Sequence, residues 1–161
     1  MCAASQFPPA ITAQMLSPSV LTPDTAQLRR LFKSDAVYDV LVNESVAQAG
    51  PYDGACLICA RAIIDAANGG ELVRIVSDVR RSQTEHYGAL INGVIYDAEG
   101  AYRTPGRWFR QLARLERIFD RTFSLSIGSD PASCIPDDPA AQAKLARLIA
   151  PAFRRGYVDP V

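Results

Sequence analysis

The sequence predicts an α+β domain in which one buried helix packs on a small antiparallel sheet. Residues 55–67 are apolar or small at nearly every position, so a helix there should be buried on most sides. Asn92-Gly93 is the favoured two-residue turn of a β-hairpin, which joins two antiparallel strands. Helix signals also stand near both ends of the chain, so extra helices should flank this core at the N-terminus and the C-terminus.

Length and composition indicate a single domain. The 161 residues suffice for one hydrophobic core, and a chain with 48% hydrophobic and 21% charged residues is typical of a soluble globular protein. Seventeen basic residues balance seventeen acidic ones, so the overall charge favours no nucleic-acid partner. We see no signal-peptide core and no apolar run near the ~18 residues of a membrane span. We therefore expect synthesis in the cytoplasm without a signal peptide.

The N-terminal third should hold an extended arm and two helices. Residues 1–21 are rich in proline and show no periodicity, which is typical of an extended arm and not of a domain. Thr22 is expected to cap a first helix, with Pro23 at its first position. A second helix should cover residues 35–48. The single folded domain is therefore expected to span residues 22–161.

The buried helix should be followed by three strands. Asn68-Gly69-Gly70 ends the helix, since these residues tolerate the left-handed conformation of a helix C-cap. Runs of apolar and alternating residues then predict strands at 71–77, 85–92 and 93–98.

The register of the hairpin brings two polar side chains together. If Asn92 and Gly93 are the two turn residues, His86 and Asp97 lie diagonally on one face, within hydrogen-bonding reach. Glu99 lies directly opposite His86 and is the competing partner.

Another strong helix is predicted from Thr104-Pro105 to about residue 120. Its buried side should carry five apolar residues: Trp108, Phe109, Leu112, Leu115 and Phe119. Its other face carries five arginines: Arg107, Arg110, Arg114, Arg117 and Arg121. Such a stripe is either a solvated face or a docking surface for an acidic partner. Residues 123–127 should form a half-buried strand, and residues 140–150 the last helix.

Cys56 and His86 have the chemistry of a nucleophile and its base. Cys56 follows the turn 50–54 and begins the buried helix, where unpaired backbone N–H groups and the helix dipole favour a thiolate. His86, the only histidine, could act as general base and acid, with Asp97 orienting the imidazole. The Cys56 backbone N–H is a natural oxyanion donor. The sequence identifies no second donor, and Tyr52, on the turn before Cys56, is a candidate by proximity alone.

Cys56 and Cys59 also form a C-x-x-C motif, which is often associated with redox chemistry or metal binding. A structural zinc site would need a second such motif or a nearby histidine. A thioredoxin-like site would need a strand directly before the motif, where this chain has a Gly/Pro turn. We therefore expect no metal and no cofactor, and Cys59 should be a small core residue. Four scattered cysteines suit a reducing compartment.

Four short segments resemble the core of the papain-like cysteine peptidase superfamily: YDGACLICARAI (52–63), GGELV (69–73), EHYG (85–88) and YDAEG (96–100). They are most similar to the small bacterial branch of NlpC-like peptidoglycan hydrolases and toxin-associated papain-like domains. The resemblance implies a papain-like core, with Cys56 as nucleophile, His86 as general base and acid, and Asp97 as the orienting residue. The helical, Pro-rich N-terminal part and the lack of a recognisable cell-wall-binding module depart from NlpC-like enzymes.

The resemblance implies a cysteine hydrolase that cleaves an amide bond in peptidoglycan or in a target-cell protein. Without a signal peptide, such an effector toxin would need a specialised route out of the cell, such as type VI secretion, a phage tail or lysis. The producing cell would then need a cognate inhibitory (immunity) partner. Two alternatives stay open. The same triad would serve a deamidase, transglutaminase or acyltransferase acting on protein side chains. A non-catalytic interaction domain would instead use the arginine-faced helix and the N-terminal arm to bind a partner.

Overall fold

The computed structural model describes residues 20–78 and 83–154. The predicted arm lies outside these residues except for Val20 and Leu21, which pack against the core. The Leu21 backbone N–H donates to the Ala67 carbonyl at 2.8 Å, so the described chain begins beside the end of the buried helix.

The larger sheet has five antiparallel strands in the order β5-β4-β3-β2-β6, which confirms the α+β class and the small antiparallel sheet. The strands are β2 (Glu71–Ser77), β3 (Gln83–Ile91), β4 (Val94–Tyr96), β5 (Ala101–Tyr102) and β6 (Phe123–Ile127). β2 and β6 have the predicted bounds. A two-stranded sheet joins β1 (Thr22–Pro23) to β7 (Phe153–Arg154).

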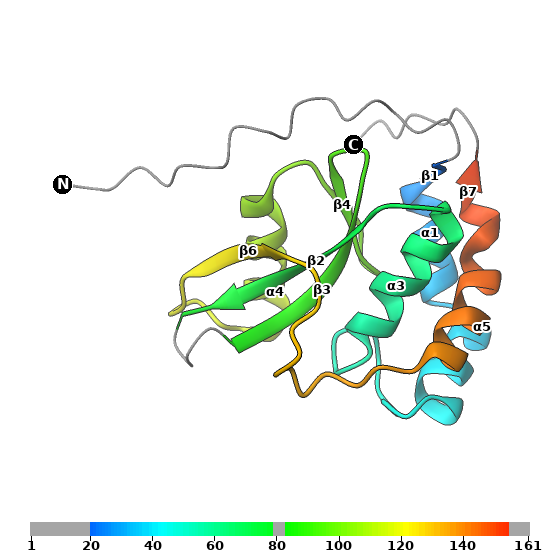
Figure 1. The fold of residues 1–161 in the computed structure, drawn as a ribbon, viewed down its shortest axis with the longest axis horizontal. Helices are drawn as coiled ribbons and strands as arrows, with labels where there is room; N and C mark the ends of the chain where they lie inside the picture. The colour runs from blue at the N-terminus through cyan, green and yellow to red at the C-terminus, as the bar shows by residue number, and fades with distance from the viewer. Residues whose placement is uncertain (1–19, 79–82, 155–161) are drawn as a thin grey trace.

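Helices pack on both faces of the five-stranded sheet. They are α1 (Thr25–Phe32), α2 (Asp35–Tyr38), the π-helix η1 (Asp39–Glu44), α3 (Cys56–Ala67), α4 (Pro105–Glu116), α5 (Pro139–Ile149) and the 3₁₀-helix η2 (Ala150–Ala152). In Figure 1, α1, α3 and α5 lie together beside the sheet, and α4 lies behind the strands. Within the described residues, no helix is long and apolar enough to cross a membrane.

The two faces of the sheet hold two separate cores. α3 is buried along most of its length, as predicted, and shares the larger core with α1, α5 and the β3–β4 hairpin. On the other face, Trp108 and Leu112 of α4 pack against Val73 and Ile75 of β2. Because Ile75 pairs with His86 across β2 and β3, His86 lies on the face that α4 covers.

The hairpin has the predicted register but a short second strand. Asn92 and Gly93 both have positive φ, 51° and 80°, as a type I′ turn requires, and Ile91 pairs with Val94. β4 pairs with β3 only as far as residue 89, so His86 has a β2 partner on one side and no strand on the other. The chain then turns and returns as β5, which the sequence did not predict.

Gly88 lets α4 approach β3 closely. A Cβ atom at this position would lie 2.7 Å from Cζ2 of Trp108, well inside van der Waals contact. The absence of a side chain therefore allows the indole ring to lie against the strand, two residues after His86.

The predictions for the first two helices were wrong at their ends. Thr22 lies in β1, and the residue that caps α1 is Asp24, whose side chain accepts a hydrogen bond from the Gln27 backbone N–H at 2.9 Å. The second helix stops at Glu44 rather than residue 48, because Ser45 has an extended backbone and its hydroxyl donates to a carbonyl of the preceding turn.

The prediction that α4 runs to residue 120 was also wrong. Arg117 adopts a left-handed conformation with φ 56° and ends the helix at Glu116. Leu115 stands in the last turn, beyond the α4 residues that contact the sheet, and is 43% exposed. Phe119 lies past the end of the helix and is 77% exposed. Both residues were predicted to be buried.

Candidate active site

Cys56 is the first residue of α3 and directly follows the N-cap residue Ala55. Ala55 occupies the N-cap position and offers no side-chain acceptor, so the first N–H groups of α3 have no side-chain cap. These groups and the helix dipole favour negative charge at this end. The Cys56 side chain packs with Leu57, Ala60 and Tyr87 and is only 3% exposed.

His86 and Asp97 lie together, as the hairpin register predicted. His86 Nε2 is 3.4 Å from Asp97 Oδ2, an ion-pair contact longer than an ordinary hydrogen bond. The imidazole is 2% exposed, and neither of its ring nitrogens has a hydrogen bond of ordinary geometry in the described part of the chain.

The surroundings of His86 favour its protonated form. Burial by itself lowers the pKa of an imidazole, but the contacts of His86 with the Asp97 carboxylate and the Cys56 thiol outweigh burial and raise its pKa to about 9. A histidine in this environment keeps its proton at neutral pH.

Asp97 is held by donors on both carboxylate oxygens. They are the Tyr52 hydroxyl (2.7 Å) and Trp108 Nε1 (2.8 Å) on Oδ2, and the backbone N–H groups of Glu99 (2.9 Å) and Gly100 (3.0 Å) and the Tyr102 hydroxyl (3.3 Å) on Oδ1. Burial alone would raise the pKa of this carboxyl, but contact with His86 and the donors lower it below its usual value. Asp97 is therefore an ionised carboxylate although only 4% exposed.

Tyr52, which the sequence offered as a candidate oxyanion donor, contacts both Asp97 and His86. Its ring stacks on the His86 imidazole, with centroids 4.4 Å apart and planes 13° from parallel. Its hydroxyl donates to Asp97, and burial together with the nearby carboxylate raises the pKa of Tyr52. The hydroxyl therefore keeps its proton and donates it in a hydrogen bond to Asp97 rather than toward a substrate.

Glu99 is not a partner of His86, although the hairpin pattern made it the competitor of Asp97. β4 ends before Glu99, and the turn at 97–100 carries its side chain toward α1. There it forms ion pairs with Arg29 at 3.1 Å and Lys33 at 3.5 Å.

Trp108 is a site residue that the sequence reasoning placed only in the core. Its ring is fully buried and lies 5.8 Å from the His86 ring at 58°, while its N–H binds Asp97. A buried indole N–H needs an acceptor, and Asp97 stands eleven residues earlier in the sequence. That requirement was the one available signal for this contact.

The C-x-x-C motif is not a disulfide. Cys56, Cys59 and Cys134 are all free thiols. Burial, with smaller contributions from Cys56 and Asp97, raises the pKa of Cys59, whose side chain lies in the larger core as predicted. Among the described residues, no group of three or more His, Cys, Asp and Glu side chains could hold a metal ion.

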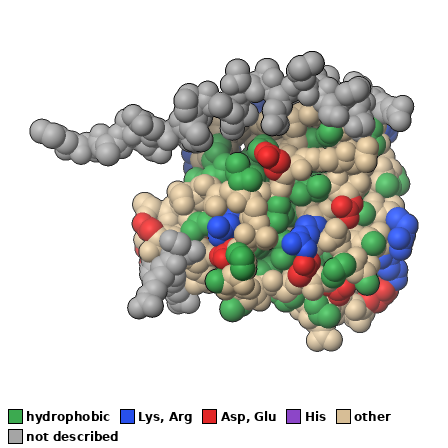
Figure 2. Space-filling view, viewed as in Figure 1, with side chains coloured by type: hydrophobic (Ala, Val, Ile, Leu, Met, Phe, Trp, Pro, Cys, Tyr) green, Lys and Arg blue, Asp and Glu red, His purple; other side chains and the backbone are tan. Residues whose placement is uncertain are grey.

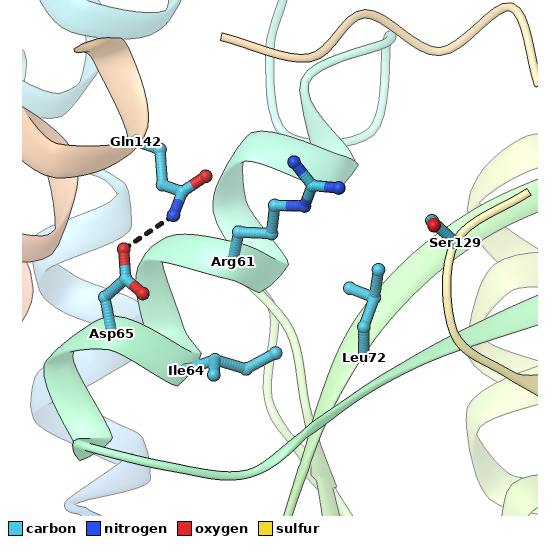
Figure 3. A pocket seen from close by; sticks show the side chains of 6 residues that line it. All are labelled: Arg61, Ile64, Asp65, Leu72, Ser129 and Gln142. Atoms are coloured by element: carbon cyan, nitrogen blue, oxygen red, sulfur yellow. Dashed lines mark hydrogen bonds between the residues drawn. The ribbon is translucent and has the colours of Figure 1, made fainter. Parts of the chain in front are cut away.

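A groove of about 460 Å³ between α3 and β2 lies apart from these residues. Its lining is formed by Arg61, Ile64, Asp65, Leu72, Ser129 and Gln142 (Figure 3). Gln142 of α5 donates to Asp65 of α3 at 2.6 Å on one side of the groove, and Arg61 forms an ion pair with Asp137. Asp65 and Arg61 therefore already have partners, and none of the three proposed catalytic side chains lines the groove.

No family model, curated protein or solved structure matches the chain. Function is therefore argued from the geometry of Cys56, His86 and Asp97 and from the sequence motifs around them.

Replacing Tyr52 by phenylalanine is expected to lower the free energy of unfolding by about 1.5–3 kcal/mol, because a buried hydrogen bond to a charged group is lost. The ring stack on His86 is kept. Tyr38→Phe is the matched control, since Tyr38 is exposed and should tolerate the same change. Urea denaturation of the two variants measures the difference. Equal stability of Tyr52→Phe and Tyr38→Phe would show that the Tyr52–Asp97 bond contributes nothing.

Proposed function

We propose that the protein is a cysteine hydrolase with a papain-like core, in which Cys56 is the nucleophile, His86 the general base and acid, and Asp97 the residue that orients the imidazole. The observation that supports this most is the buried His86, in contact with an ionised Asp97 and raised in pKa by Asp97 and Cys56. Such an imidazolium beside a thiol at a helix N-terminus is the arrangement that activates a cysteine nucleophile.

The proposed reaction has two halves. The Cys56 thiolate attacks the carbonyl carbon of an amide, and the oxygen takes up the negative charge near the Cys56 backbone N–H. The C–N bond then breaks as His86 gives its proton to the leaving amine, which leaves an acyl-enzyme. In the second half, His86 removes a proton from water, the resulting hydroxide attacks the acyl carbon, and the thiolate departs.

Access to the site adds a requirement to this proposal. Cys56 lies in a cluster with Tyr87, and Ile135 from the loop before α5 packs against that cluster. The loop is anchored by Asp130, which contacts Arg74 at 3.1 Å and Thr84 at 2.8 Å. A substrate carbonyl can reach the thiolate only if side chains packed on Cys56 give way.

The substrate proposal rests on the sequence motifs alone. Their resemblance to NlpC-like and toxin-associated papain-like domains supports peptidoglycan or a target-cell protein as substrate. It also supports an effector delivered by a specialised secretion system, with a cognate inhibitory partner in the producing cell. A deamidase, transglutaminase or acyltransferase would use the same acyl-enzyme, and would release ammonia from glutamine-containing peptides without cleaving them.

The catalytic pair is tested by the pH dependence of alkylation at each cysteine, followed by mass spectrometry. Cys56 is expected to react with iodoacetamide below pH 7, where an ordinary thiol with a pKa near ~8.5 is mostly protonated. The exposed Cys134 is the comparison thiol in the same sample, and the buried Cys59 should stay unreacted. His86→Ala should remove the advantage of Cys56. If Cys56 behaves like Cys134, or is inert in both proteins, the proposal is wrong.

His86 is expected to titrate with a pKa of about 9 in the folded protein, above its usual 6.5. Because the folded-state value is raised, the interaction stabilises the fold fully below pH 6.5, and this stabilisation is lost as the pH rises through about 9. His86 is the only histidine, so one imidazole signal in an NMR titration of untagged protein reports it. Asp97→Asn should move that signal toward lower pH. A wild-type midpoint at or below 6.5 would contradict the prediction.

A further inference from the structure

We infer that the outer face of α4 is a docking surface for an acidic protein. Four arginines follow one another at every third or fourth position, and we call them the arginine ridge: Arg107, Arg110, Arg114 and Arg117. This spacing places them on one side of α4 and its C-cap. All four are exposed, on the side of α4 opposite the buried Trp108 and Leu112.

The arginines of α4 and its C-cap have no acidic partner among the described residues. In that part of the chain, no ion pair joins an acidic residue to Arg107, Arg110, Arg114 or Arg117. Other basic residues do have such partners, for example Arg61 with Asp137, Arg121 with Glu85 and Lys144 with Glu44. On the face shown in Figure 2, basic and acidic side chains lie interspersed. The ridge therefore stands out on a chain whose formal net charge is zero.

An ordinary solvated face does not account for this pattern. Like charges three and four residues apart on a helix repel and destabilise it, whereas a solvated helix usually intersperses charges of opposite sign. α4 contains one acidic residue, Glu116. It is the last residue of the helix and lies far from Arg107 near the helix start. An acidic partner would remove the repulsion, and the planar guanidinium groups would bind its carboxylates in pairs of hydrogen bonds.

Two observations favour a protein over nucleic acid or a membrane as the partner. Exposed apolar side chains, Leu115 and Phe119, stand at the C-terminal end of the ridge, and protein interfaces combine arginine with such apolar anchors. The chain as a whole is electrically neutral, so it lacks the broad positive field that attracts phosphate polymers and anionic lipid.

A designed peptide tests the surface on the full chain. The probe is a fluorescein-labelled helical peptide with glutamates at the same spacing as the ridge and leucines beside them, and its control is a scrambled peptide of equal composition. Anisotropy should show tighter binding of the patterned peptide. Arg107→Glu combined with Arg114→Glu should weaken it by about tenfold or more. Arg30→Glu combined with Arg147→Glu makes the same charge change at exposed positions elsewhere and should leave binding unchanged.

Further measurements separate the partners. A 20-base-pair DNA duplex and vesicles containing phosphatidylserine should bind more weakly than the patterned peptide, and Phe119→Ser should weaken the peptide alone. Arg107→Gln combined with Arg114→Gln removes the repulsion without reversing the charge, so it should keep or raise the melting temperature while losing the peptide. Tighter binding of DNA or vesicles, or equal binding of both peptides, would overturn the inference. These results do not depend on the Cys56 chemistry.

Discussion

Cys56→Ala is expected to lower the turnover of acyl substrates by on the order of 10⁴-fold or more, because the acyl-enzyme cannot form without the thiolate. Two probes measure this: the release of p-nitrophenol from p-nitrophenyl acetate, and the cleavage of soluble peptidoglycan fragments followed by mass spectrometry. The ester reports the acyl-transfer chemistry even if peptidoglycan is not the substrate.

Cys59→Ala is the matched control for this change. Cys59 lies one helical turn from Cys56, is equally buried at 3% exposure, and points into the larger core. Its replacement removes a sulfur atom from the same helix without touching His86 or Asp97, so activity should be kept. Equal losses in the two variants would indicate damage to the fold rather than to a nucleophile. Unchanged activity in Cys56→Ala would favour the non-catalytic interaction domain.

Asp97→Ala is expected to lower the free energy of unfolding by about 3–5 kcal/mol, the usual range for removing one member of a buried ion pair. The change leaves the Trp108 N–H and the Tyr52 hydroxyl without their acceptor in a buried environment. It also leaves the His86 charge without its counter-ion. Urea denaturation at neutral pH measures the effect.

The stabilisation that Asp97 provides should depend on pH. The pKa of Asp97 is lowered in the folded protein, so its stabilisation is present above its ordinary value of 3.8 and is lost as the pH falls through the folded-state value. The gap between wild type and Asp97→Ala should therefore shrink in acid. Asp137→Ala removes a partly exposed ion pair with Arg61 and should cost less than about 1 kcal/mol. Equal effects of the two variants would contradict the central role of the Asp97 cluster.

The parts of the fold that the sequence predicted well are those with strong local signals. The left-handed end of α3 at Asn68 and the Asn92-Gly93 turn set the bounds of their neighbours, because few residues adopt those backbone angles. The π-helix η1, the two-residue strand β5 and the early end of α4 have no such signal. Each of these three features depends on how the chain packs against the core at that point.

The candidate site divides in the same way. Cys56 could be placed from a helix start, and His86 beside Asp97 from a hairpin register, since both are local geometry. The Tyr52–Asp97 bond joins residues 45 positions apart, and no periodicity in the sequence indicates it. Glu99 was misplaced because the hairpin was extended past the residue at which β4 ends.

The close approach of Trp108 to Gly88 links two distant sequence positions. Any side chain at position 88 would collide with the indole, and a smaller residue at position 108 would leave a gap and remove one of the two hydrogen bonds to Asp97 Oδ2. The two positions should therefore vary together in any set of homologous chains, glycine accompanying tryptophan. A glycine two residues after the histidine, followed by a tryptophan twenty residues later, is a pattern by which relatives of this chain could be recognised.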